Sequence, residues 1–145
     1  MSSFAYKAKN EICRTQLSRQ CCARAEAYGV LLYCNTFTPS EVRIITENPE
    51  FAARTAFLRG AFLAGGSVTD PEKRYHMELA TNHKQASREV SRLLEEMGFL
   101  PRSVQRGVNY LIYFKQSEHI EDLLTKIGAP AAAMDIMTAK VDKEI

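Results

Sequence analysis

Residues 58–68 read Leu-Arg-Gly-Ala-Phe-Leu-Ala-Gly-Gly-Ser-Val, an apolar run that ends in two glycines and two further residues. Its small residues recur at helical spacing, which lets the backbones of two helices approach closely. A glycine inside a helix costs about 1 kcal/mol relative to alanine, so close packing is a sensible compensation. The stretch therefore predicts a helix that packs against a second helix through four small residues: Gly60, Ala61, Ala64 and Gly65.

A similar unit precedes this one in the chain. Residues 28–37 and 59–68 both carry glycine in second position, an apolar helical middle, and then Thr or Ser followed by a hydrophobic residue. Repetition at this scale favours two copies of one unit packed by pseudo-twofold symmetry. Gly29 and Leu32 would then belong to the packing surface of the first helix.

Two other interpretations of residues 58–68 stay open. Gly65 and Gly66 fit a plain glycine stop at the end of a helix. Together with Gly60 and Ser67 they also fit a phosphate-binding loop whose lysine is replaced. A helix precedes these glycines where such a loop needs a strand, so nucleotide binding is disfavoured.

The periodicity of the remaining chain predicts an α+β fold. Between Leu58 and Gly128 the order is helix, strand, helix, strand, strand, helix, which favours helices on one face of a small antiparallel sheet. The other face of that sheet would be free. We expect a first helix from Ser2 or Ser3 through Leu17 and further helices over 22–33, 49–65, 86–97, 117–127 (capped by Ser117) and 130–139. We expect strands over 42–46, 75–81 and 104–114. The last of these is a hairpin that turns at Arg106-Gly107 and places Val108, Tyr110, Ile112 and Phe114 on one face.

Composition describes an ordinary globular chain of 145 residues, 46% hydrophobic and 25% charged, with a net charge of +2. One domain or one repeated domain is expected at this length. Residues 1–24 contain five basic residues against one acid, whereas residues 117–145 contain six acids against three basic residues. This asymmetry could orient the molecule on a polyanion, or it could reflect two unrelated solvated surfaces.

Several classes of function are disfavoured by what the sequence lacks. No apolar run approaches the roughly 20 residues of a membrane span, and no signal peptide is recognisable, so we expect a cytoplasmic protein. The cysteines show no C-x-x-C spacing and no nearby histidine pair, so we predict reduced thiols, no metal and no cofactor. These cysteines are Cys13, Cys21, Cys22 and Cys34.

The motifs carry a specific resemblance. Residues 58–68, followed by Asp70-Pro71-Glu72-Lys73 and Tyr75-His76, resemble the second LAGLIDADG-type motif of WhiA, a bacterial family of sporulation and cell-division regulators. Cys21-Cys22 with Ala25-Glu26 resembles the opening of the first motif, and residues 109–115 resemble the later hairpin. The resemblance implies a homing-endonuclease-like fold with paired motif helices and an antiparallel, saddle-like sheet.

The resemblance also divides the chain. It implies an N-terminal helix with an abbreviated first repeat over 1–57, a second repeat over 58–139, and a tail or linker over 140–145. The family's first repeat runs through further strands and a helix, whereas Arg54 passes here almost directly into the second motif. The family's C-terminal helix-turn-helix domain has no counterpart after Gly128. Whether the short repeat is natural, engineered or a missing segment stays open.

By the same resemblance, the chain lacks the acids of a nuclease. In LAGLIDADG nucleases an acidic residue at the end of each paired helix holds a divalent cation at the scissile phosphate. The aligned positions here are Cys34 and Gly65, and neither offers a carboxylate. Asp70 and Glu72 lie beyond the turn and are expected to be solvated loop charges. We therefore expect no enzymatic cleavage.

What the scaffold would retain is binding to double-stranded DNA, close to the nucleoid. Phosphate contacts need Lys and Arg, and base edges are recognised by forked polar groups on a ribbon that fits the major groove. The alternatives are an oligomerisation or protein-interaction module, whose former DNA face binds a second copy or another transcription protein, and an active nuclease. The residues expected to contact DNA from the free sheet face are Lys73, Arg74, His76, Arg102, Gln105, Arg106 and Asn109.

Overall fold

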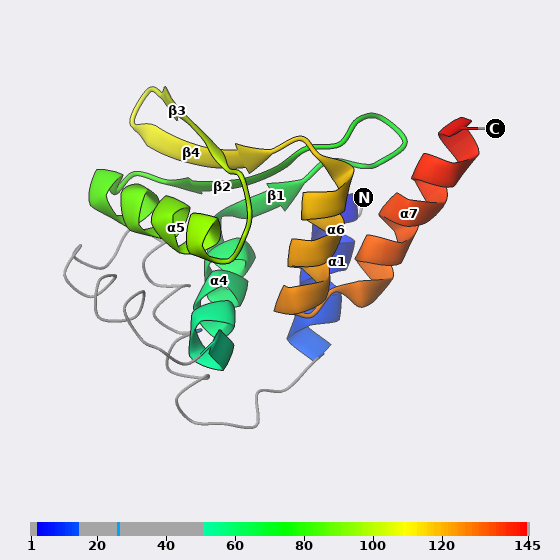
Figure 1. Ribbon diagram of the computed structural model, residues 1–145, viewed down its shortest axis with the longest axis horizontal. Helices are drawn as coiled ribbons and strands as arrows, with labels where there is room; N and C mark the ends of the chain where they lie inside the picture. The colour runs from blue at the N-terminus through cyan, green and yellow to red at the C-terminus, as the bar shows by residue number, and fades with distance from the viewer. Residues whose placement is uncertain (1–2, 15–25, 27–50, 145) are drawn as a thin grey trace.

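The computed structural model describes residues 3–14, 26 and 51–144. The helix expected over 22–33, the strand expected over 42–46, and Gly29, Leu32 and Cys34 lie outside the described residues. The described elements, coloured along the chain in Figure 1, are α1 (Phe4–Arg14), α4 (Phe51–Gly65), β1 (Gly66–Val68), β2 (Met77–Thr81), α5 (Lys84–Glu96), β3 (Arg102–Arg106), β4 (Asn109–Phe114), α6 (Ser117–Ile127) and α7 (Pro130–Glu144).

The four strands form one antiparallel sheet in the order β1-β2-β4-β3. Helices α4 and α5 lie beneath the strands, and α1, α6 and α7 group at one end (Figure 1). Alternation along the strands explains this arrangement, because β2 buries Met77, Leu79 and Thr81 on the side of the helices. The predicted α+β fold, with helices on one face of a small antiparallel sheet, is confirmed.

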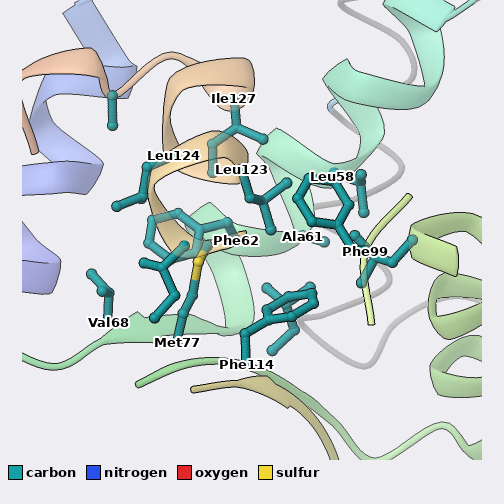
Figure 2. Packing of buried hydrophobic residues seen from close by; sticks show 14 of the residues in the cluster. Leu58, Ala61, Phe62, Val68, Met77, Phe99, Phe114, Leu123, Leu124 and Ile127 are labelled. Atoms are coloured by element: carbon teal, nitrogen blue, oxygen red, sulfur yellow. The ribbon is translucent and has the colours of Figure 1, made fainter. Parts of the chain in front are cut away.

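The core lies between the sheet and helices α4 and α6. Phe62 of α4, Met77 of β2 and Phe114 of β4 meet the apolar side chains of α6 (Figure 2). Phe62 and Met77 are fully buried, and burial of such a side chain stabilises a fold by about 1.5–3 kcal/mol. These contacts attach the covered face of the sheet to the helices, so the opposite face is not required for packing.

Gly66 marks the point where α4 passes directly into β1. The helix stop expected at Gly65-Gly66 is therefore confirmed, but the sequence does not predict β1, since three residues are too few to display alternation. A β-carbon at position 66 would lie 2.7 Å from the carbonyl oxygen and 2.8 Å from the α-carbon of Phe62. Glycine is thus required here, because the preceding turn of α4 leaves no room for a β-carbon.

Arg59 ties three parts of the chain together from within the protein. Its side chain is buried, and its Nη2 donates a hydrogen bond to the carbonyl oxygen of Ile12 at 2.8 Å. Its Nε donates to Oε1 of Glu26 at 3.0 Å. Because Glu26 belongs to the segment that resembles the first motif, this ion pair joins the two motif-like segments.

The ends of the described chain also meet. Ser3 caps α1, as expected, because its Oγ accepts a hydrogen bond from the Tyr6 N–H at 3.1 Å. Glu11 of α1 accepts hydrogen bonds from the N–H groups of Ala131 (2.7 Å) and Ala132 (3.1 Å) at the start of α7. A carboxylate is well suited to this position, since the N-terminus of a helix carries partial positive charge.

The hairpin turn lies one residue later than predicted. Arg106 pairs with Asn109, so the two turn residues are Gly107 and Val108 rather than Arg106 and Gly107. Primed two-residue turns need a positive φ at their first central position, and Gly107 supplies it with φ 59°. Val108 consequently lies exposed in the turn and outside β4, so its predicted place on one face with Tyr110, Ile112 and Phe114 was wrong.

Two helix ends also differ from the prediction. Gln116, not Ser117, is the N-cap of α6, and Ser117 is a buried residue of the first turn. Helix α7 continues to Glu144 instead of ending near Ala139, so residues 140–144 are helical and not a tail. The extension is held by Lys143, whose Nζ donates to the carbonyl oxygen of Pro71 at 2.5 Å and lies 4.5 Å from the Tyr75 ring centroid.

Candidate nucleic-acid interface

The face of the sheet opposite the helices follows from the register of the strands. Glu78 and Ala80 alternate with the buried residues of β2, and they pair with Tyr113 and Leu111 of β4. The same β4 residues pair with Arg102 and Val104 of β3, and Asn109 pairs with Arg106. Cross-strand partners share a face. We call this surface the open face and define it as Arg74, His76, Glu78, Ala80, Arg102, Val104, Arg106, Asn109, Leu111, Tyr113 and Lys115.

The open face is hollowed rather than flat. The hollow on this face measures about 400 Å³ and is lined by residues from the β1–β2 loop and from β2, β3 and β4. Leu111 is 6% exposed and does not belong to the main core cluster, so it forms part of the floor of this hollow. The wall is polar and the floor apolar.

An aromatic and polar cluster occupies one end of the open face. His76 stacks on Tyr113, with ring centroids 5.6 Å apart and an interplanar angle of 20°. His76 Nε2 lies 3.0 Å from Oε1 of Glu78, and Lys115 Nζ lies 5.7 Å from the Tyr113 ring centroid. The carboxylate of Glu78 is therefore engaged by His76, which immediately precedes β2.

The arginines of the open face differ from three others in the described structure. Arg54, Arg59 and Arg92 each form an ion pair with a glutamate. Arg74, Arg102 and Arg106 have no acidic partner within residues 3–14, 26 and 51–144, and all three are exposed. The open face thus carries guanidinium groups that are available to an external anion.

Most of the residues expected at a DNA interface come together here. Arg74, His76, Arg102, Arg106 and Asn109 belong to the open face. Tyr113, Lys115 and Glu78 were not among the residues expected at this face, although strict alternation from the buried residues of β2 and β4 indicates Glu78 and Tyr113.

Two expected residues lie elsewhere. Gln105 was wrongly placed on the free face: it points to the side of α5, because adjacent residues of a strand face opposite sides and Arg106 is on the open face. Lys73 is exposed in the β1–β2 loop, where it lines a separate hollow beside α1 together with Lys7 and Asp70.

The positions considered for cation binding can be placed in part. Gly65 ends α4 and brings no side-chain ligand. Asp70 and Glu72 are exposed, as expected, and Asp70 Oδ1 accepts a hydrogen bond from the Glu72 N–H at 2.9 Å. No group of three or more His, Cys, Asp or Glu side chains in the described part of the chain is arranged to hold a metal ion.

The phosphate-loop interpretation of residues 60–67 does not match the structure, since helix α4 precedes the glycines and strand β1 follows them. A phosphate-binding loop of that type requires the opposite order of strand and helix. Within the described ranges, no helix combines the length and the apolar character that crossing a bilayer requires.

The chain is similar to known proteins over most of its length. A family model described as the WhiA LAGLIDADG-like domain matches residues 54–145. The probable cell division protein WhiA of Alkaliphilus metalliredigens is 42% identical over 92 residues, which is 63% of this chain and 29% of that protein. The protein of the same name from Ruminiclostridium cellulolyticum is 25% identical over 216 residues, covering 99% of this chain and 69% of the relative.

Two solved structures share the fold. The N-terminal LAGLIDADG domain of DUF199/WhiA superposes with a TM-score of 0.74 at 18% identity, covering 88% of this chain and 94% of that one. Full-length DUF199/WhiA from Thermatoga maritima superposes with a TM-score of 0.82 at 16% identity, covering 99% of this chain and 67% of that one. The predicted LAGLIDADG-like fold is thereby confirmed, while the matched region spans less than a third of the first relative's length.

Proposed function

Since this chain belongs to the WhiA family, whose LAGLIDADG-like domain matches residues 54–145, we propose that it is a DNA-binding transcriptional regulator of sporulation or cell division. The name of its relatives, probable cell division protein, supports the biological assignment. The open face is the surface that we assign to duplex DNA.

The observation that carries this proposal is the set of unpaired arginines on a two-stranded ribbon. Arg102 and Arg106 lie on β3, and Asn109 lies opposite Arg106 on β4. A two-stranded ribbon fits the major groove, where arginine recognises guanine and asparagine recognises adenine through paired hydrogen bonds. Arg74 and Lys115 border the same hollow and are suited to phosphate contacts.

We further propose that the chain binds DNA without cutting it. Cleavage by a homing-endonuclease mechanism needs carboxylates at the ends of the paired helices, to hold cations over the scissile phosphate. Gly65, at the end of α4, has no such group. The described helix can therefore contribute packing to the scaffold but no ligand to a catalytic cation.

Duplex binding at several salt concentrations tests the assignment. We expect fluorescence anisotropy to show an affinity that falls linearly on a log–log plot against salt, with a slope of about −0.9 for each phosphate contact. The double variant Arg102→Glu/Arg106→Glu should bind about tenfold more weakly or worse, because both uncommitted cations become repulsive. Incubation with magnesium should leave the duplex intact.

A matched control separates the site from net charge. The variant Lys84→Glu/Arg88→Glu changes two exposed cations of α5, on the other side of the sheet, by the same amount. It should retain most of the duplex affinity. Equal loss in both variants contradicts the open face as the binding surface, and undetectable binding of the unaltered chain favours a protein-interaction module instead. Magnesium-dependent cleavage contradicts the non-nuclease assignment.

A further inference from the structure

A second hollow, also of about 400 Å³, lies between strand β3 and helix α5. Helix α5 packs against β2 and β4, whereas all five residues of β3 are exposed. Ser103 and Gln105 are the β3 side chains on this side of the sheet, and both line the hollow. The covered face of the sheet is thus left open beneath β3, and we call this hollow the edge groove.

The backbone of β3 is oriented for strand pairing. Among the described strands, β3 is an edge of the sheet. Because the hairpin turns through two residues, the flanking pair Arg106 and Asn109 is the hydrogen-bonded type, and pair types alternate along the strands. The N–H and C=O groups of Ser103 and Gln105 therefore point away from β4, along the edge groove.

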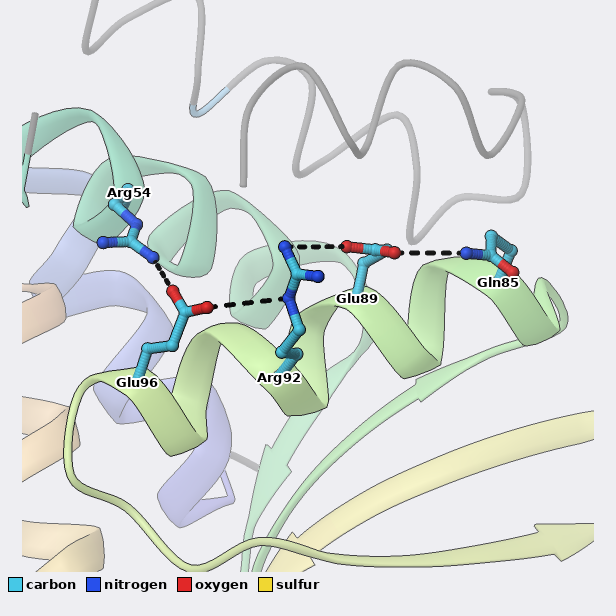
Figure 3. A network of polar contacts seen from close by, with 5 residues as sticks. All are labelled: Arg54, Gln85, Glu89, Arg92 and Glu96. Carbon is cyan, nitrogen blue, oxygen red and sulfur yellow. Dashed lines mark hydrogen bonds and ion pairs between the residues drawn. The ribbon is translucent and has the colours of Figure 1, made fainter. Parts of the chain in front are cut away.

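The helix wall of the edge groove is mainly basic, although Glu95 also lines it. Lys84, Arg88 and Arg92 recur every fourth residue along α5 and line the groove. Arg92 is held by Glu89 at 3.9 Å and Glu96 at 3.6 Å, as Figure 3 shows. Lys84 and Arg88 have no acidic partner in the described part of the chain, so two uncommitted cations face this edge.

Two other occupants fit the groove poorly. A second copy pairing through β3 about Val104 in antiparallel register would set Arg102 opposite Arg106 twice, and like charges directly opposite are destabilising. A DNA duplex has no strand-like row of N–H and C=O groups to satisfy the edge of the sheet. Only an extended polypeptide supplies both backbone pairing and alternate side chains that reach the helix.

We propose that the edge groove binds an extended acidic segment of another protein, which adds to β3 as a fifth strand. Alternate side chains of the added strand point to the two sides of the sheet. Acidic side chains on the α5 side would meet Lys84 and Arg88, and β-branched side chains on the other side would lie beside Val104. This inference goes beyond DNA binding and does not depend on it, because its charge contacts lie on the α5 side of the sheet, opposite Arg102 and Arg106.

A synthetic peptide provides the probe. A fluorescent peptide of about ten residues that alternates glutamate and threonine matches the length and polarity of an added strand. We expect the full chain to bind it, and a peptide that alternates lysine and threonine not to bind. Lys84→Glu/Arg88→Glu should weaken binding by about tenfold or more, because attraction becomes repulsion.

A separate variant tests how much the backbone hydrogen bonds of β3 contribute to peptide binding. Ser103→Pro removes an N–H that points away from β4, and proline is tolerated at such edge positions. It should weaken peptide binding by about tenfold or more, whereas the matched variant Ser103→Ala should bind within about twofold of the unaltered chain. Duplex binding should persist in both, which distinguishes failure of this inference from failure of the DNA assignment.

Three outcomes overturn the inference. The first is no binding of the glutamate-threonine peptide by the unaltered chain. The second is full peptide binding by Ser103→Pro, which indicates charge attraction without strand addition. The third is preferential binding of a single-stranded oligonucleotide that Lys84→Glu/Arg88→Glu abolishes. If Ser103→Pro does not fold, amide exchange of Ser103 and Gln105 in the unaltered chain decides, since strand addition must protect both N–H groups.

Discussion

The two faces of one sheet differ in burial and in composition. On the covered face, Met77, Ile112 and Phe114 are at most 3% exposed and hold the strands to the helices. On the open face, the alternate positions include charged and aromatic side chains that lie outside the main core cluster. The same strands therefore serve stability with one set of positions and, in the function proposed above, recognition with the alternate set.

The arginines make the same contrast within one residue type. Arg59 is buried and fully engaged with Ile12 and Glu26, so its charge serves the fold. Arg102 and Arg106 are exposed without acidic partners among the described residues, so their charges are available to a ligand. The presence of an acidic partner, and not the number of arginines, determines which guanidinium groups are available to an external ligand.

The largest expected effect breaks the covered face. Phe62→Ala removes a fully buried ring from the contact between α4, the sheet and α6. The free energy of unfolding should fall by about 3–5 kcal/mol, because both burial and close packing are lost. Urea denaturation followed by circular dichroism measures this. A loss of less than about 1 kcal/mol contradicts the assignment of this region as the main core.

An intermediate effect is expected from the buried arginine. Arg59→Met keeps much of the side-chain volume but leaves the carbonyl oxygen of Ile12 without its donor and Glu26 without its cation. We expect a loss of about 1–3 kcal/mol in the free energy of unfolding, the usual cost of an unsatisfied buried polar group. Arg59→Lys is the matched variant, and an unchanged stability in both contradicts the structural role of this residue.

A much smaller effect on stability is expected on the open face. Arg102→Gln/Arg106→Gln removes two charges from exposed positions that have no acidic partner in the described structure. The free energy of unfolding should change by less than about 0.5 kcal/mol, even though duplex binding weakens. Parallel urea titration and anisotropy measure both quantities. A large loss of stability shows that the two faces are not independent.

The smallest effect concerns an exposed charge contact away from the sheet. The hydrogen bond from Lys140 Nζ to Glu118 Oε1 is the main cause that lowers the pKa of Glu118 from 4.5 to about 2. A lowered carboxylate pKa contributes stability above pH 4.5, which is lost as the pH falls from 4.5 to about 2. Glu118→Gln should remove this pH-dependent difference in stability, because glutamine does not titrate. The difference is expected to be small, because the contact is solvent-screened. Thermal melts at pH 6 and pH 3 (about 1.5 units either side of pKa 4.5) give the comparison.

The sequence predicts the elements with strong periodicity. Helix α5 and its end near Gly98, the hairpin, and the stop at Gly128 follow from apolar spacing and glycine, and the structure confirms each. Apolar periodicity is informative because long buried stripes tolerate few exceptions. The fold class could therefore be predicted from local pattern and motif resemblance.

The finer details depend on contacts between distant residues. One glycine beside Arg106 does not reveal which central position of the turn it occupies, so the turn was misplaced by one residue. The last turns of α7 depend on Lys143 reaching Pro71, a partner 72 positions away. Which arginines are free also depends on partners such as Glu26, which sequence order does not disclose.

The contact between Glu11 and the start of α7 has a consequence for synthesis. Glu11 and Ala131 are 120 positions apart, and a growing chain emerges from the ribosome N-terminus first. Glu11 therefore cannot form these hydrogen bonds until nearly the whole described polypeptide has been synthesised. Docking of α1 onto α7 therefore follows the synthesis of α7 and is a late step in the assembly of this fold.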